Sequence, residues 1–397
     1  MVYKNDFFNF DELNSKSAMA FPLDEYRERI KRLSRKLETL EVDAYLGFTP
    51  ENMNYFTGFD PLGLYFYQHL LFASGMDSPS LITHKCEKEL ARTQCWIDDI
   101  SIWQHGDDPL KMTVNKLREA GIQKGSRVGL EMDNWYFKAS TYKGLVDAMP
   151  GVEFFDVTQE ILRLRTIKSS AEIACMREAA RFSDMGFAAA VEAIRPGVSE
   201  AEILAQVQSN MTAAGSEYPT LPFIINSGAR SGLFHGVPTG KRLAQGDPVM
   251  IEITGSWKRY NSNIVRTVVA GKATPALNGL WDIVNESFWR PFDLIKPGTP
   301  VSELDRLSRE IRSQHEPYIP ARAGFGMGLA YPPVWAGHPD ILIGDDEVLQ
   351  EGMIFSLEPS IAQYHGATVI FGYNILVTES GAEILQQTPR DIFEIAA

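Results

Sequence analysis

The first 165 residues alternate between helix-like and strand-like patterns of apolar and polar positions. Charged and apolar residues recur at helical spacing over 23–40. A short apolar run at 43–48 then predicts a buried strand, and an aromatic, turn-rich segment follows at 52–58. Further apolar runs and the helix-like pieces between them lie at 70–73, 80–83, 110–120, 127–130 and 141–148. This alternation predicts an α/β domain.

The second half of the chain orders its elements differently. Ser169 and Glu172 form a serine cap with an acidic first turn, which predicts a helix that ends near residue 194. A second helix begins at Ser199. Later strand-like and helix-like segments lie at 248–253, 265–270, 277–295, 301–314, 353–358 and 369–377. We therefore predict an α+β domain in which helices cover a curved antiparallel sheet, with domains at 1–166 and 167–397.

Composition and charge narrow the class of protein. Hydrophobic residues make up 44% and charged residues 22%, which is ordinary globular usage. The net charge of −13 argues against nucleic acid or an anionic membrane as the main partner. Three cysteines without C-x-x-C spacing fit a reducing compartment. Residues 1–10 lack the pattern of a signal peptide, and no apolar stretch is long enough to span a bilayer. We expect a cytoplasmic protein with a small-molecule substrate.

Three residues are candidates for catalytic chemistry. His235 lies in the Gly/Ser-rich loop 226–236, where it either acts as acid or base in a cleft or is a surface or hydrogen-bonded loop histidine. Glu252 interrupts the apolar run 248–253, and Glu358 follows the apolar run 354–357. A buried carboxylate needs a partner, a ligand or a proton, although an edge strand would instead point it at solvent. Two such glutamates favour a shared polar pocket.

Other classes of catalytic site leave no signature in the sequence. The remaining histidines do not form an H-x-x-x-H or comparable spacing for metal ligands. A Gly-rich phosphate loop, a G-x-S-x-G elbow and a cysteine-nucleophile signature are also missing from the sequence. Nucleotide-dependent and serine-hydrolase chemistry are therefore disfavoured.

Several motifs, taken in chain order, resemble the creatinase and Xaa-Pro peptidase superfamily. They lie at 52–58, 167–180, 227–235, 260–267, 324–328, 351–359 and 377–381. The resemblance covers almost the whole chain. It implies an N-terminal α/β domain and an α+β catalytic domain of the "pita-bread" type.

The resemblance also shows where this chain departs from the family. Peptidases of the superfamily hold two metal ions with two aspartates, a histidine and two glutamates. This sequence places Glu252, Asn263, Phe325, Glu358 and Gly372 at the matching positions. Phenylalanine and glycine side chains cannot coordinate a metal, and asparagine is a weak neutral ligand. We therefore predict that the chain has no metal site and needs no cofactor.

Two metal-free relatives suggest a reaction. The segment 252–260 is similar to ectoine hydrolase, whose nucleophilic glutamate resembles Glu252, and the catalytic histidine of creatinase resembles His235. We expect hydrolysis of a non-peptide C–N bond in a small amidine-like or guanidine-like compound. Glu252 would attack the carbon or hold the substrate cation, His235 would move the proton, and Glu358 would pair with positive charge.

Aromatic residues are candidates for the walls of the substrate pocket. They are Tyr65, Tyr260, Phe325, Tyr331 and Trp335. Such rings face cations through π interactions, although core packing is the alternative for each of them. By its resemblance to creatinase, the chain is expected to form a homodimer in which one N-terminal domain covers the partner's site.

Three other functions stay open at this stage. A metallohydrolase for Xaa-Pro peptides with a degenerate site is the first, and a lyase of the dimethylsulfoniopropionate type is the second. Against the lyase, that branch keeps metal ligands, whereas this chain has Asn263 and Phe325. The third is a non-enzymatic binding protein, which the joint presence of His235, Glu252 and Glu358 disfavours.

Overall fold

The computed structural model describes residues 16 and 18–396, and it divides the chain into two compact units. The units are Met1–Leu164 and Arg165–Ala397, so the division falls two residues before the predicted boundary. The α/β and α+β classes of the two halves are confirmed. The segment 1–10, which was read for a signal peptide, lies outside the described residues.

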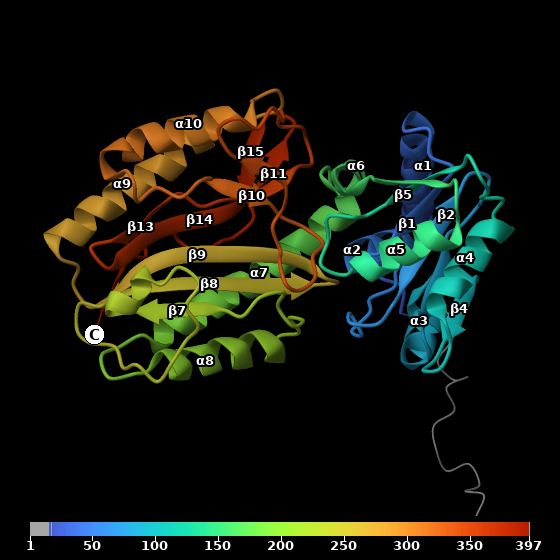
Figure 1. Ribbon diagram of the computed structural model, residues 1–397. Helices are drawn as coiled ribbons and strands as arrows, with labels where there is room; N and C mark the ends of the chain where they lie inside the picture. The colour runs from blue at the N-terminus through green and yellow to red at the C-terminus, as the bar shows by residue number, and fades with distance from the viewer. Residues whose placement is uncertain (1–15, 17, 397) are drawn as a thin grey trace, which may run out of the picture. The chain divides into compact units, whose positions relative to one another are not determined.

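The N-terminal unit is a six-stranded mixed sheet with helices, in the strand order β4-β3-β2-β1-β5-β6 (Figure 1). Strands β1 and β2 pair antiparallel, whereas β1 and β5 pair parallel. All four residues of β1 are buried, so both faces of the sheet are covered at its centre. Its helices and strands are α1 (Leu23–Thr39), β1 (Ala44–Gly47), α2 (Pro50–Thr57), β2 (His69–Ala73), β3 (Ser80–His84), α3 (Lys88–Gln94), β4 (Ile100–Trp103), α4 (Pro109–Glu119), β5 (Arg127–Leu130), α5 (Ala139–Ala148), β6 (Glu153–Asp156) and α6 (Thr158–Leu162).

One predicted segment of this unit has a different structure. Residues 52–58 were expected to form an aromatic, turn-rich segment, but 52–57 belong to the helix α2 and Gly58 caps it. The side chain of Thr49 accepts a hydrogen bond from the Asn52 amide, and Pro50 occupies the first helical turn. Gly58 ends the helix with a φ of 85°. Thr, Pro and Gly at these places are the ordinary start and stop signals of a helix.

The C-terminal unit is built on a ten-stranded sheet whose main path runs β11-β10-β12-β14-β9-β8-β7. Neighbouring strands along this path pair antiparallel. Its helices and strands are α7 (Ser170–Ala193), α8 (Glu200–Ala213), β7 (Ile224–Ser227), β8 (Pro248–Trp257), β9 (Tyr260–Ala270), α9 (Pro275–Phe292), α10 (Val301–Arg312), β10 (Gly324–Gly326), β11 (Gly337–Ile341), β12 (Ile354–Leu357), β13 (Ser360–Tyr364), β14 (Ala367–Thr378), β15 (Gly381–Ile384) and β16 (Glu394–Ile395).

Alternation along the long strands gives this sheet two chemically different faces. Ile251 and Ile253 of β8 belong to one large apolar core, together with side chains of α7, α8, α9 and α10. Glu252 lies between these two isoleucines, so its side chain points to the opposite face. A small apolar cluster that includes Met250 and Val265 lies on that opposite face. We call this side of the sheet the polar face, because it carries Glu252 and several amide side chains in addition to the apolar cluster.

A membrane-spanning helix is not found in the part of the chain that the structure describes. Each of its helices falls short in length or in apolar character. The cytoplasmic location stays a prediction.

Candidate active site

Strand register brings several polar side chains to the polar face of the C-terminal sheet. On the neighbouring strands β8 and β9, Asn263 lies opposite Thr254, and Glu252 lies opposite Val265. Gly372 of β14 pairs with Val265 on its other side. Directly paired residues of a sheet share a face, and so do residues two apart on one strand. Glu252, Thr254 and Asn263 therefore form one group.

The strands β10, β12 and β14 add a second row to this face. Ser356 of β12 lies opposite Asn374 of β14 and opposite Phe325 of β10. The Ser356 hydroxyl donates a 2.8 Å hydrogen bond to Oε2 of Glu358, the second residue after β12 ends. Glu252 and Glu358 are more than 100 residues apart in the sequence. The sheet brings both of them next to Asn263.

The amide of Asn263 joins the two glutamates. Its Nδ2 donates to Oε1 of Glu252 at 3.2 Å and to Oε2 of Glu358 at 3.1 Å. Asn263 is buried, Glu252 is 7% exposed, and Glu358 is half-buried. One neutral group thus bridges two carboxyls that have little access to water. We call Glu252 and Glu358 the carboxyl pair.

Burial and mutual repulsion hold protons on the carboxyl pair. Burial, together with the charge of Glu358, raises the pKa of Glu252 to about 8, while the hydrogen bond from Asn263 acts in the opposite direction. Burial also raises the pKa of Glu358, against the hydrogen bonds from Ser356 and Asn263 and the nearby charge of Arg322. Two close carboxyls in a dry site cannot both ionise easily. Near neutral pH the pair therefore shares a proton, which suits it to acid–base chemistry.

Two residues that the sequence reasoning missed belong to this site. The Thr254 hydroxyl is buried, and it has no hydrogen-bond partner among the described residues. The Arg322 guanidinium lies 4.6 Å from the centroid of the Phe325 ring and forms an ion pair with Asp340. A buried hydroxyl without a partner is uncommon, and this one lies next to Asn263. No sequence motif marks either residue, because their place depends on strand register.

His235 makes no described contact with the carboxyl pair. His235 is exposed on the loop that follows β7, and its ring contacts the ring of Phe234 at a centroid distance of 5.5 Å. The side chain of Asn226 holds this loop through Nδ2, which donates 2.9 Å hydrogen bonds to the carbonyls of Leu233 and Gly236. Among the described contacts, none joins His235 to Glu252 or Glu358. Its predicted catalytic role stays a prediction.

In the described contacts, none of the five predicted pocket aromatics touches the carboxyl pair. The Tyr260 hydroxyl donates a 2.9 Å hydrogen bond to Glu172, the third residue of α7 and part of its capping box. Tyr331 and Trp335 are buried, as core packing would require. Tyr65 is 77% exposed and belongs to the N-terminal unit. Phe325 lies nearer to the pair along the sheet, since it is opposite Ser356, whose hydroxyl binds Glu358.

The residues at the family's metal-ligand positions do not fit a pair of metal ions. Asn263 turns its Nδ2 hydrogens, not its oxygen, toward Glu252 and Glu358. Phe325 and Gly372 offer no ligand atom. Across residues 16 and 18–396, no group of three or more His, Cys, Asp or Glu side chains is arranged to hold a metal ion. Divalent cations need several oxygen or nitrogen ligands, so two carboxyls bridged by a donor are a poor site for them.

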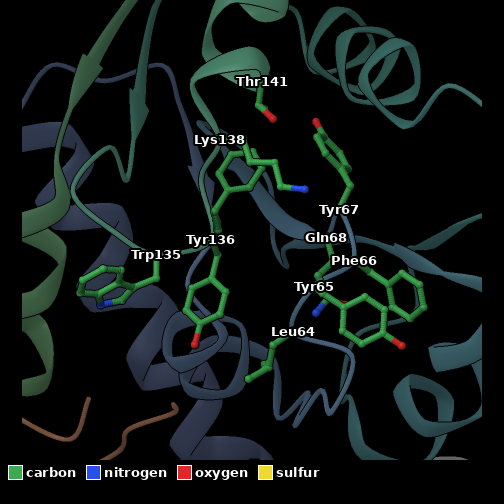
Figure 2. Close-up of a pocket in the computed structure, with 10 residues that line it drawn as sticks. Leu64, Tyr65, Phe66, Tyr67, Gln68, Trp135, Tyr136, Lys138 and Thr141 are labelled. Carbon is green, nitrogen blue, oxygen red and sulfur yellow. The ribbon is translucent and has the colours of Figure 1, made fainter. Parts of the chain in front are cut away.

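A separate cavity lies within the N-terminal unit. It has a volume of about 150 Å³ and is lined mainly by aromatic side chains. Figure 2 shows Tyr65, Phe66 and Tyr67 on one side of it and Trp135 and Tyr136 on the other. This volume is small beside ordinary ligand pockets of about 300–1,000 Å³. The cavity therefore gives no independent support for a catalytic role.

Known proteins similar to this chain are mostly peptidases by name. The Xaa-Pro dipeptidase of Pyrococcus furiosus is 30% identical over 368 residues, covering 92% of this chain and 99% of the relative. The ectoine hydrolase of Halomonas elongata is 26% identical over 400 residues, covering 95% and 98%. Among solved structures, an Xaa-Pro dipeptidase from Bacillus anthracis has a TM-score of 0.82 at 28% identity and covers 93% of this chain and 99% of that one.

These relatives correct the predicted reaction. Hydrolysis of a non-peptide C–N bond in an amidine-like compound was expected, and that expectation is wrong. The Xaa-Pro dipeptidases stand nearer in identity than ectoine hydrolase, and a solved prolidase from Pyrococcus horikoshii repeats the result at 28% identity, a TM-score of 0.81 and coverage of 92% and 100%. The similarity to ectoine hydrolase over 252–260 is local, and it does not outweigh the similarity of the whole chain. The broader prediction of a hydrolase is supported.

Two family patterns cover most of the chain. The pattern named Creatinase/Prolidase N-terminal domain matches residues 29–167. The pattern named Metallopeptidase family M24 matches residues 174–379, which is more than half of the 397 residues. They agree with the predicted superfamily and with the order of its two domains. The chain therefore belongs to metallopeptidase family M24.

Proposed function

We propose that this chain hydrolyses the bond between a carbonyl carbon and a nitrogen in small peptides of the Xaa-Pro class. The names of its relatives support the class of substrate. The observation that carries the proposal is the pair of buried carboxyls, Glu252 and Glu358, bridged by the amide of Asn263. By the resemblance, Glu252 and Glu358 correspond to two of the positions at which the family's peptidases carry metal ligands, and both belong to the polar face of this sheet.

The two members of the carboxyl pair divide the acid and base roles. The ionised carboxyl takes a proton from water, and the water oxygen forms a bond to the carbonyl carbon of the peptide. The protonated carboxyl gives its proton to the leaving nitrogen as the C–N bond breaks. The pKa of Glu252, raised to about 8, supplies a protonated carboxyl near neutral pH, whereas the hydrogen bonds from Ser356 and Asn263 favour the ionised form of Glu358.

Thr254 stabilises the charge that develops on the substrate oxygen. Its hydroxyl is buried, and its partner residue across the strands is Asn263. Because no residue that the structure describes binds this hydroxyl, it would donate to an oxyanion without first breaking another hydrogen bond. Thr254 is therefore the electrophilic element of the proposed site.

The proposed reaction proceeds without a pair of bound metal ions. The donor set supports this part of the proposal, because Asn263, Phe325 and Gly372 replace three of the five ligands that the family's peptidases use. The acid–base work falls to the carboxyl pair instead.

Assays on a panel of Xaa-Pro dipeptides test the proposal. We expect release of proline by the wild type and a loss of kcat of about 1,000-fold in Glu252→Gln, within the range of one general acid or base. Glu383→Gln is the control, because this glutamate pairs with Arg177 on the protein surface. Activity should persist in protein freed of metal by a chelator, as checked by elemental analysis. The proposal fails if proline is not released, or if release needs added metal.

We also propose that two copies form a homodimer through their N-terminal units. Leu62, Tyr65 and Trp135 are each more than 70% exposed there. Large exposed apolar side chains are typical of protein–protein contact sites. Light scattering should give twice the mass of 44.4 kDa for the wild type and a shift toward one mass for Tyr65→Ser with Trp135→Ser. A wild type of single mass would contradict the dimer.

A further inference from the structure

The strands β9 and β14 separate next to the carboxyl pair, and one side chain fills the gap. Their backbone pairing is described at Phe371 with Arg266 and at Gly372 with Val265. Beyond it, Gln386 takes the place of a peptide group between the strands. Its Nε2 donates 2.8 Å to the carbonyl of Asn263, and its Oε1 accepts 2.9 Å from the amide of Asn374. Gln386 therefore satisfies one backbone group of each strand.

These two backbone contacts fix which way the Gln386 amide faces. A backbone N–H can only donate and a backbone carbonyl can only accept, so the oxygen and nitrogen of Gln386 cannot exchange places. Its Nε2 also donates 3.0 Å to the Ser262 hydroxyl. That hydroxyl in turn donates 2.6 Å to Oδ1 of Asn374. The orientation of Gln386 is thus passed on to Asn374.

The same logic continues to the carboxyl pair. Because Oδ1 of Asn374 accepts from Ser262, its Nδ2 faces Asn263 and donates 2.7 Å to Oδ1 there. Asn263 must then turn its own Nδ2 away from Asn374, toward the two glutamates. Ser262, Asn263 and Asn374 are fully buried, and Gln386 is 5% exposed, so water offers little compensation for a reversed amide.

We propose that Gln386, acting through Ser262 and Asn374, is a positioning residue that fixes the Asn263 amide as a donor to both carboxyls and thereby excludes divalent cations from the space between them. A reversed Asn263 would present its oxygen beside four carboxyl oxygens, which is the type of ligand set that Mn²⁺ prefers. The inference rests on the proposed function only for the identity of the reacting groups. The orientation of the amide does not depend on any substrate.

Binding of Mn²⁺, measured from the free-ion signal in electron paramagnetic resonance, tests this inference without an activity assay. Ser262→Ala removes the hydroxyl that connects Gln386 to Asn374, and it does not change the charge of the protein. The variant loses the hydrogen bond that orients the Asn374 amide. The free energy of about one hydrogen bond corresponds to Mn²⁺ binding that is tighter by roughly fivefold to tenfold. Ser262→Thr keeps the hydroxyl and should bind as weakly as the wild type.

Gln386→Met provides a second variant, with Gln387→Met as its matched control. Gln386 is buried in the chain of hydrogen bonds, whereas Gln387 is exposed. We expect tighter Mn²⁺ binding in the former and no change in the latter, in proteins shown by thermal unfolding to be folded. Equal affinity in Ser262→Ala, Gln386→Met and the wild type would overturn the inference, and so would tight stoichiometric Mn²⁺ in the wild type. Failure of the dipeptidase assay alone would leave these measurements standing and would refute only the proposed function.

Discussion

Two buried glutamates of the C-terminal unit, Glu200 and Glu252, have opposite electrostatic surroundings. The carboxylate of Glu200 accepts hydrogen bonds from the amides and hydroxyls of Ser227 and Thr239 at 2.8–3.0 Å, and it pairs with Arg230 at 3.1 Å. Burial acts to raise the pKa of Glu200, but the hydrogen bonds from Ser227 and Thr239 outweigh it and lower the pKa. Glu200 is a charged, fully satisfied structural group.

Glu252 is nearly as buried but poorly satisfied. Within the described residues it accepts one hydrogen bond, from the neutral amide of Asn263, and it faces Glu358. Its pKa is raised, not lowered. Burial of a carboxyl therefore does not identify a reactive group. A shortage of hydrogen-bond donors around a buried carboxyl does identify one, because such a carboxyl can exchange its proton with a substrate.

Stability as a function of pH should show the largest effect of this difference. The folded-state pKa of Glu252 is raised from 4.5 to about 8, so the folded protein binds one more proton than the unfolded chain between these values. The free energy of unfolding should then fall as pH rises, by up to roughly 1.4 kcal/mol per pH unit. Glu252→Gln removes this loss, so its advantage over the wild type should grow from pH 4.5 to pH 8.

Urea unfolding at several pH values measures this advantage directly. The gain should level off above about pH 8, where Glu252 is ionised in both folded and unfolded protein. Glu358→Gln is the partner experiment, since it removes the charge that repels Glu252. Parallel curves of unfolding free energy against pH for Glu252→Gln and the wild type would mean that folding does not raise the pKa of Glu252. The acid–base proposal would then lose its basis.

Glu200→Gln should have the opposite signature and a smaller effect. It removes charge-assisted hydrogen bonds and leaves Arg230 without its carboxylate, which we expect to cost about 3 kcal/mol at pH 7. Because the folded-state pKa of Glu200 is lowered, the wild type's advantage is present above pH 4.5 and is lost as pH falls through that lowered pKa. The turnover number of the folded fraction should not change. A large fall in kcat would place Glu200 in the reaction.

Much of the fold was predictable because local patterns determined it. The strand predicted at 127–130 matches β5, and the serine caps at Ser169 and Ser199 are both present as capping boxes. The helix α2 was not predicted, because seven of its eight residues are buried and it therefore lacks the polar face of an amphipathic helix. Short strands such as β10 (Gly324–Gly326) carry too few residues for any periodic pattern.

The site was predictable in part, and for a physical reason. Glu252 and Glu358 stood out because charged residues in apolar surroundings are costly. Thr254 and Gln386 carry no such signal, since their importance depends on which strands become neighbours. Gln386 meets Asn263 across 123 residues of sequence, a pairing that only the assembled sheet creates.

Gly372 offers the finest test of how the carboxyl pair is held, because the pair has room only while this residue lacks a side chain. A Cβ added at Gly372 would lie 2.7 Å from Cβ of Glu358, 2.7 Å from Cγ1 of Val265 and 2.9 Å from the carbonyl of Leu357. Gly372→Ala should therefore cost about 2 kcal/mol in unfolding free energy through overpacking, and it should lower kcat by displacing Glu358. Gly279→Ala is the matched control, since its Cβ would meet nothing within 4 Å and should stabilise α9 by up to about 1 kcal/mol. If Gly372→Ala kept full stability and full kcat, Glu358 would not depend on the close approach of β14, and the contrast with the tightly held Glu200 would have to rest on hydrogen bonds alone.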